Sequence, residues 1–322
     1  MSDSAPLLIP FASALAEGCR AALRELALPN LEKLLARLQP GEIAAGEPES
    51  LSMPHERLLA RVAGIDAADG CLPLAALGEA LAGHETGRAA FAWITPCHWR
   101  VARDHIAMVN PDEMNLSQAE SMAVLDAVRP YFEEDGMHIT YQSPLRWLAR
   151  GDIFAGLATA SLDRVAGKTI DTWMPRAANA APLRRLQQEA QMLLYTHAVS
   201  DARQASGLAP VNSFWVSGAG ALPASFDASA VARWNVDERL RTSALNEDWP
   251  AWAAAWRDID STACARLLAA LDAGREVTLA LCGERGAQTW RPRERGGYLN
   301  NLGARVVRLV GRKQVSATLE AL

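Results

Sequence analysis

Short apolar runs alternate with longer helical stretches along this chain, and this alternation is what most constrains its fold. Leu7–Ile9, Ala89–Thr95 and Asn212–Val216 have the pattern of buried strands, and Val277–Leu281 is a fourth. Between them lie stretches such as Pro182–Tyr195, where apolar residues recur at helical spacing. Alternating strands and helices favour a mostly parallel sheet covered by helices. We therefore predict an α/β fold with helices on both faces of the sheet.

Local signals place several elements within this plan. Ser117 and Glu120 form a capping-box pattern that starts a helix, and Asn30 is predicted to cap the helix that follows it. Met137–Tyr141 and Leu145–Ala149 alternate and lie close enough in sequence for a β-hairpin. The hairpin and its neighbouring helices predict a smaller α+β domain inserted into the main one.

Composition narrows the classes of function. The 322 residues are 50% hydrophobic and 21% charged, with a net charge of −5, which is typical of an ordinary globular protein and unlike a nucleic-acid binder. The five cysteines are widely spaced without a CxxC pair, so buried thiols in a reducing compartment are expected. The first residues lack the basic region of a signal peptide, and no run is long enough for a membrane span. We expect a cytoplasmic protein that binds neither nucleic acid nor membrane.

The segment His197–Pro223 is the most distinctive stretch of the sequence. A polar loop leads into an apolar strand that is predicted to end at Gly218-x-Gly220. Glycines after a strand permit a sharp turn and close approach of the backbone to a ligand. A phosphate cradle and a simple packing turn are both compatible with this spacing.

This segment resembles archaeal-type 2,3-bisphosphoglycerate-independent phosphoglycerate mutases. The matching positions are His197, Val199, Arg203, Gly207, Pro210, Asn212, Trp215, Gly218 and Gly220. Weaker similarities occur at Leu28–Leu34, Leu74–Trp99 and Leu116–Arg146. The whole chain is more similar still to a proteobacterial group known as RpfE-type regulatory proteins. The resemblance implies an alkaline-phosphatase-like core formed by residues 1–90 plus 207–322, with an inserted α+β domain at 91–206.

The sequence departs from this family where the enzymes hold two metal ions and a phosphoryl-accepting serine. The first strand runs into Pro10 and Phe11 instead of Asp-Gly, and the nucleophile region contains Ser52 and His55 instead of Gly-Ser-Asp. No histidine follows His197. Two hard cations need clustered carboxylates and histidines. We therefore expect no metal and no cofactor, and we assign no catalytic residue.

The candidate ligand-binding residues are those that could contact a phosphorylated small molecule. Arg146, His197, Arg203 and Asn212 are implied by the resemblance, whereas His98 and Arg100 share one face of a predicted strand. Solvated polar groups at a strand edge are the alternative for the last two residues. A tryptophan stripe, Trp249, Trp252 and Trp256, is compatible with core packing or with a protein partner.

Two functional hypotheses follow from these observations. The first is a catalytically degenerate mutase-like protein that is regulatory or binds a small anionic ligand. The second is an active phosphoglycerate mutase or phosphotransferase with a rebuilt active site, in which His55 accepts the phosphoryl group and Ser52 lies nearby.

Overall fold

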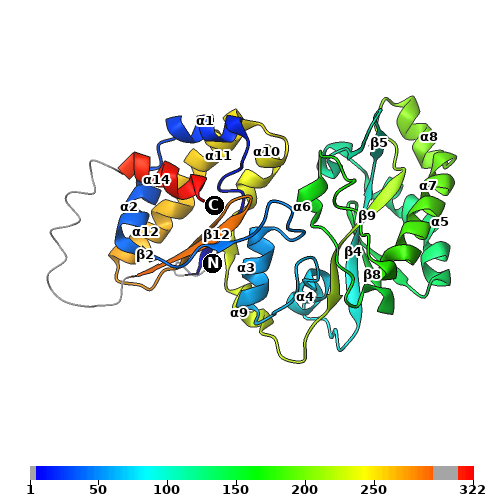
Figure 1. Ribbon diagram of the computed structural model, residues 1–322, viewed down its shortest axis with the longest axis horizontal. Helices are drawn as coiled ribbons and strands as arrows, with labels where there is room; N and C mark the ends of the chain where they lie inside the picture. The colour runs from blue at the N-terminus through cyan, green and yellow to red at the C-terminus, as the bar shows by residue number, and fades with distance from the viewer. Residues whose placement is uncertain (1–4, 293–310) are drawn as a thin grey trace. The chain divides into compact units, whose positions relative to one another are not determined.

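The computed structural model describes residues 5–292 and 311–322, and the chain divides into two compact units (Figure 1). Unit 1 is Met1–Pro48 with Ala230–Leu322, and unit 2 is Glu49–Ser229. Both units combine strands and helices, which confirms the α/β class. The division into 1–90 plus 207–322 and 91–206 stays a prediction. None of the described helices combines the length and apolar character needed to cross a membrane.

Unit 1 contains a six-stranded mixed sheet with the strand order β10-β1-β11-β12-β2 and with β3 also paired to β12. Its first strand, β1 (Leu7–Ile9), matches the predicted bounds and is fully buried. It lies between β10 (Asn235–Val236) and β11 (Leu279–Cys282) and is parallel to both. The antiparallel strands of this sheet are β12 (Gly286–Pro292), β2 (Leu38–Pro40) and β3 (Ala44–Ala45).

The expectation of a mostly parallel sheet is wrong. Among the pairings between two named strands in the described residues, only those of β1 are parallel. The larger sheet of unit 2 is antiparallel throughout. The reason is the length of the connections. A parallel crossover needs a dozen or more residues, whereas β11 ends at Cys282 and β12 already begins at Gly286. The predicted strand at Arg305–Val310 lies outside the described residues.

Helices of unit 1 bury their apolar stripes around this sheet. Trp252 and Trp256 are completely buried, and their indole Nε1 atoms donate hydrogen bonds to the carbonyls of Phe11 (2.9 Å) and Ala12 (3.3 Å). The helices are α1 (Glu17–Glu25), α2 (Pro29–Arg37), α10 (Arg241–Leu245), α11 (Trp249–Ile259), α12 (Ala265–Asp272) and α14 (Gly311–Glu320), with α9 (Ala228–Ala232) at the boundary between the units. A π-helical turn, Asp260–Cys264, joins α11 directly to α12.

Unit 2 is built on a four-stranded antiparallel sheet with the order β7-β8-β4-β9. The predicted hairpin is confirmed as its first two strands. A separate two-stranded hairpin follows β4 along the chain. The strands are β4 (Ala90–Cys97), β5 (Trp99–Val101), β6 (Ile106–Met108), β7 (His138–Ser143), β8 (Arg146–Arg150) and β9 (Ser213–Ala221).

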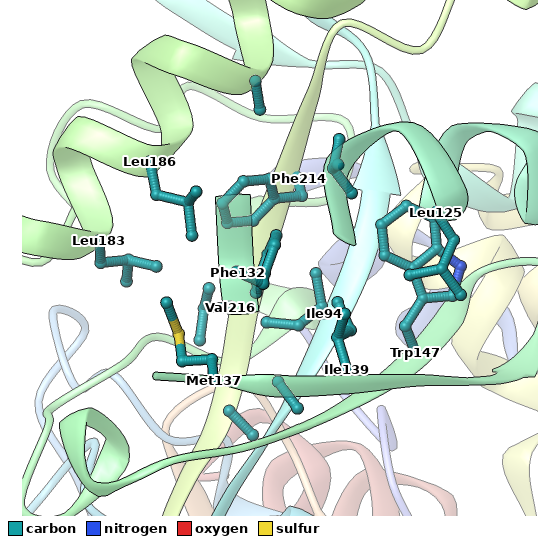
Figure 2. Packing of buried hydrophobic residues seen from close by; sticks show 14 of the residues in the cluster. Ile94, Leu125, Phe132, Met137, Ile139, Trp147, Leu183, Leu186, Phe214 and Val216 are labelled. Atoms are coloured by element: carbon teal, nitrogen blue, oxygen red, sulfur yellow. The ribbon is translucent and has the colours of Figure 1, made fainter. Parts of the chain in front are cut away.

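The main core of unit 2 lies between this sheet and two long helices. Phe132 of α5 and Phe214 of β9 meet with ring centroids 5.2 Å apart (Figure 2). Leu183 and Leu186 of α7 point into the same cluster, which is fully buried (Figure 2). The helices of unit 2 are α3 (Pro54–Val62), α4 (Leu74–Leu81), α5 (Gln118–Glu134), α6 (Leu162–Val165), α7 (Ala181–Tyr195) and α8 (Ala198–Ala205).

Candidate functional site

Arg203, a predicted ligand contact, lies buried with only 1% of its surface exposed. Its Nε donates to the carbonyl of Ala209 at 2.8 Å, and its Nη1 donates to Glu120 at 3.0 Å. Its Nη2 donates to the carbonyl of Met114 at 2.5 Å. Each guanidinium nitrogen therefore serves the protein itself, tying α8 to the start of α5.

The loop before β9 is fixed by a side chain at each of three successive carbonyls. Arg203 donates to the carbonyl of Ala209. The Nδ1 of His98 lies 2.9 Å from the carbonyl oxygen of Pro210, and the Ser200 hydroxyl donates to the carbonyl of Val211 at 2.9 Å. Burial lowers the pKa of His98. These internal hydrogen bonds give Arg203, His98 and Ser200 a structural role in holding the loop.

Asn212 completes this lock at the junction of β4 and β5. Its Oδ1 accepts the N–H of Trp99 at 2.7 Å, and its Nδ2 donates to the Trp99 carbonyl at 2.9 Å. The amide thus imitates a strand partner for Trp99. Among the predicted residues, the structure brings Arg203, His98 and Asn212 together around one loop.

The other predicted residues lie apart from this loop or on its flank. His197 caps α8, with its Nδ1 accepting the N–H of Val199 at 3.3 Å. The guanidinium of Arg146 stacks 4.9 Å above the ring of Trp93. Arg100 is exposed on β5. A common anion site formed by all six candidates is not assembled within unit 2, and their ligand contacts stay a prediction.

The Gly218-x-Gly220 motif is a packing device inside β9, which continues to Ala221 instead of breaking at Ser217. Gly218 has φ +62°, and a Cβ there would lie 3.0 Å from the ring of Trp93. A Cβ on Gly220 would lie 2.9 Å from the Cβ of Pro73. Both glycines let the start of α4 approach the strand closely, which favours the packing interpretation of the motif.

A pocket of about 840 Å³ lies immediately beyond this strand, within unit 2. One wall is apolar and comes from the chain after β9, including Leu222, Pro223 and Phe226. The other wall is the loop between α4 and β4, which supplies His84 and Arg88. Glu85, Thr86 and the glycines at 83 and 87 also line it.

The imidazole of His84 is held in place by a partly buried acid. Its Nδ1 lies 2.8 Å from an oxygen of Glu79, whose other oxygen accepts the amide of Gln142 at 2.7 Å. The side chain of Glu79 is only 12% exposed. Because Nδ1 is engaged, Nε2 is the ring nitrogen that a ligand could use. The exposed Arg88 adds a fixed positive charge.

No protein-family model matches the sequence, and none of the curated proteins matches it. Two solved structures are similar at low scores. A cofactor-independent phosphoglycerate mutase from Thermoplasma acidophilum DSM 1728 has 16% identity and a TM-score of 0.35, covering 91% of each chain. The PH0037 protein from Pyrococcus horikoshii has 13% identity and a TM-score of 0.40, covering 90% of this chain and 87% of its own. No conclusion about function rests on likenesses of this size.

A protein metal centre needs several oxygen, nitrogen or sulfur donors grouped around one point. Among residues 5–292 and 311–322, no three His, Cys, Asp or Glu side chains are grouped so that they could hold a metal ion. The two-metal centre of the mutases that the sequence resembles has no matching donor set in this part of the chain. We therefore derive no step through a metal.

A second polar cluster surrounds the first turn of α3. Glu56 accepts the N–H of Met53 and the hydroxyl of Ser161, both at 2.7 Å. Burial raises the pKa of Glu56 to about 7. Next to it, the Nε2 of His55 lies 4.0 Å from a carboxylate oxygen of Asp163. This cluster places a histidine, an acid with a near-neutral pKa and a second carboxylate within one small region.

Ser52 belongs to the backbone framework of this cluster. Its hydroxyl accepts the N–H of Gly70 at 3.0 Å, and its carbonyl accepts hydrogen bonds from Arg57 and Arg164. With 3% of its surface exposed, Ser52 serves as a loop anchor.

His84 and Arg88 are not among the residues predicted from the sequence. Their signal is the stretch Gly83–Arg88, in which two glycines with positive φ bracket polar residues between a helix and a strand. Such a loop permits concave backbone, but only the fold shows that residues 221–228 supply the opposite wall.

Proposed function

We propose that this protein binds a small anionic, phosphorylated molecule and acts through binding instead of metal-dependent phosphoryl transfer. The observation that carries the proposal is the pocket beyond β9, where Arg88 and His84 face an apolar wall. The guanidinium of Arg88 and the Nε2–H of a protonated His84 are suited to phosphate oxygens. The apolar wall is suited to the carbon skeleton of the ligand.

The chemistry of the pocket also limits the ligand. Glu85 lines the same wall, so a multiply charged polyphosphate would meet repulsion there. One phosphate on a short carbon chain fits the charges better. The regulatory role implied by the sequence resemblance belongs to this proposal, with ligand occupancy as the signal.

Isothermal titration calorimetry tests the proposal with 3-phosphoglycerate and with inorganic phosphate. We expect 3-phosphoglycerate to bind more tightly than phosphate alone, and Arg88→Ala to weaken its binding about tenfold or more. Arg61→Ala is the matched control, since Arg61 is exposed on α3 and does not line the pocket. Equal binding by both variants would contradict the assignment of the pocket.

The second candidate function is phosphoryl transfer at His55, which the arrangement of His55, Glu56 and Asp163 favours. In this case the imidazole accepts the phosphoryl group, Asp163 orients the ring, and Glu56 exchanges a proton near neutral pH. A coupled assay for interconversion of 3- and 2-phosphoglycerate, with added manganese, distinguishes the two functions. Turnover that is abolished in His55→Ala but retained in Arg88→Ala would favour the enzyme.

A further inference from the structure

The oxygen of Leu322 is held by two successive backbone N–H groups in the turn between β11 and β12. Arg285 donates to it at 3.0 Å and Gly286 at 2.5 Å. The residue is buried, as are Val315 and Leu319 on the same segment. The segment Gly311–Leu322 is thus seated by three apolar side chains and a pair of adjacent donors.

The seat lies where open α/β sheets take their ligands. β1 has a parallel neighbour on each side, and ligands of such sheets bind outside the carboxyl ends of the parallel strands. Gly283 directly follows the last residue of β11. A Cβ on Gly283 would lie 2.6 Å from the carbonyl carbon of Leu322 and would collide with the Ser13 hydroxyl. Leu322 therefore fills the space at this end of the sheet.

The segment contributes no strand to the sheet. α14 packs against α1 and α2, beside which Figure 1 shows it in red. Its departure would leave every described strand pairing of unit 1 in place. It would uncover the N–H groups of Arg285 and Gly286 together with a slot for an aliphatic side chain.

We propose that this seat is a peptide-binding site and that Gly311–Leu322 is its detachable intramolecular occupant. The ligand class is a short peptide that places a leucine-like side chain against Gly283 and a main-chain oxygen on the two N–H donors. The site is independent of the pocket beyond β9, because it lies wholly in unit 1.

A labelled peptide with the sequence of residues 311–322 tests the site by fluorescence anisotropy. In the full chain carrying Leu319→Asp and Leu322→Asp, the intramolecular occupant is weakened, so the peptide should bind at least tenfold more tightly than to the unmodified protein. A peptide with the same two aspartates is the control and should not bind. Adding Gly283→Ala to the protein should abolish binding. Equal binding to both proteins, or binding to neither, would overturn the proposal.

Hydrogen exchange of the unmodified protein provides an independent measurement if the double variant does not fold. A detachable segment predicts that the amides of Arg285 and Gly286 exchange at least tenfold faster than the paired amides of β11. Identical exchange rates would show that the segment opens only with the whole unit and would overturn detachment.

Discussion

The carboxylate of Asp260 accepts the N–H of Leu31 at 2.7 Å, although 229 residues separate them in sequence. The same side chain accepts the N–H and the side-chain amide of Asn30, both at 3.2 Å. α2 has no side-chain cap of its own. A residue in the π-helical turn therefore caps α2 from outside.

Asp260→Ala should lower the stability of unit 1 by about 1–2 kcal/mol, because the first N–H groups of α2 lose their acceptor. Asp260→Asn keeps one oxygen acceptor and should cost less. Urea denaturation followed by circular dichroism measures both. Asp66→Ala, at an exposed position, is the control and should change stability little.

Arg203→Ala should cost about 2–4 kcal/mol, since the carbonyls of Met114 and Ala209 lose their donor and Glu120 keeps only its bonds from Ser117. Arg203→Lys should not restore stability, because an ammonium cannot reach three divergent acceptors. Arg100→Ala, on the exposed hairpin, should stay within about 0.5 kcal/mol. Thermal unfolding of the three variants checks the order; comparable Arg203→Ala and Arg100→Ala values would refute the structural role.

The stability of unit 2 should fall as pH rises through the pKa of Glu56. Burial raises this pKa from 4.5 to about 7, so between these values the folded state binds a proton that the unfolded state has released. The resulting stabilisation is complete at acidic pH and is lost as pH passes about 7. The Glu56→Gln variant should lack this dependence of stability on pH. Near pH 8 it should be more stable than the unmodified protein by roughly 1–3 kcal/mol.

Denaturation midpoints at roughly pH 5 and pH 8 measure this effect of Glu56. Glu133→Gln, an exposed substitution on α5, provides the charge-matched control. The explanation fails if Glu56→Gln and the unmodified protein show the same slope with pH.

Gly220→Ala should destabilise unit 2 by about 2–4 kcal/mol. Gly220 has φ +150°, and the new Cβ would also meet Pro73 at the start of α4. Gly64→Ala is the matched control, because φ is +74° but nothing lies within 4 Å of the added Cβ. It should cost only about 1 kcal/mol from backbone strain. If Gly220→Ala and Gly64→Ala lower the calorimetric melting temperature by similar amounts, the close approach of α4 to Gly220 is not the cause of the destabilisation.

The sequence predicts helix caps and hairpins correctly where the interacting residues lie close together along the chain. The capping box of Ser117 and Glu120 and the hairpin of β7 and β8 are confirmed, since each depends on neighbouring residues. The prediction that Asn30 caps α2 was wrong. Leu28 occupies the cap position, and the capping carboxylate comes from the distant Asp260. No local pattern encodes such a pairing.

Polar residues were harder to interpret because their roles depend on burial. Arg203 and Asn212 were expected to contact a ligand, but their hydrogen bonds to Met114 and Trp99 become visible only once the chain is folded. The Gly218-x-Gly220 spacing was compatible with a cradle or with packing. The proximity of Pro73 favours packing.

The π-helical turn at Asp260–Cys264 also determines which way the side chains of α12 face relative to those of α11. Such a turn accommodates one residue more than an α-helical turn, and each residue corresponds to about 100° of rotation about the helix axis. Deleting Ser261 would let one unbroken α-helix run through this region. Leu267 and Ala270, now buried, would then swing toward solvent. A single extra residue thus aligns the apolar stripe of α12 with α2.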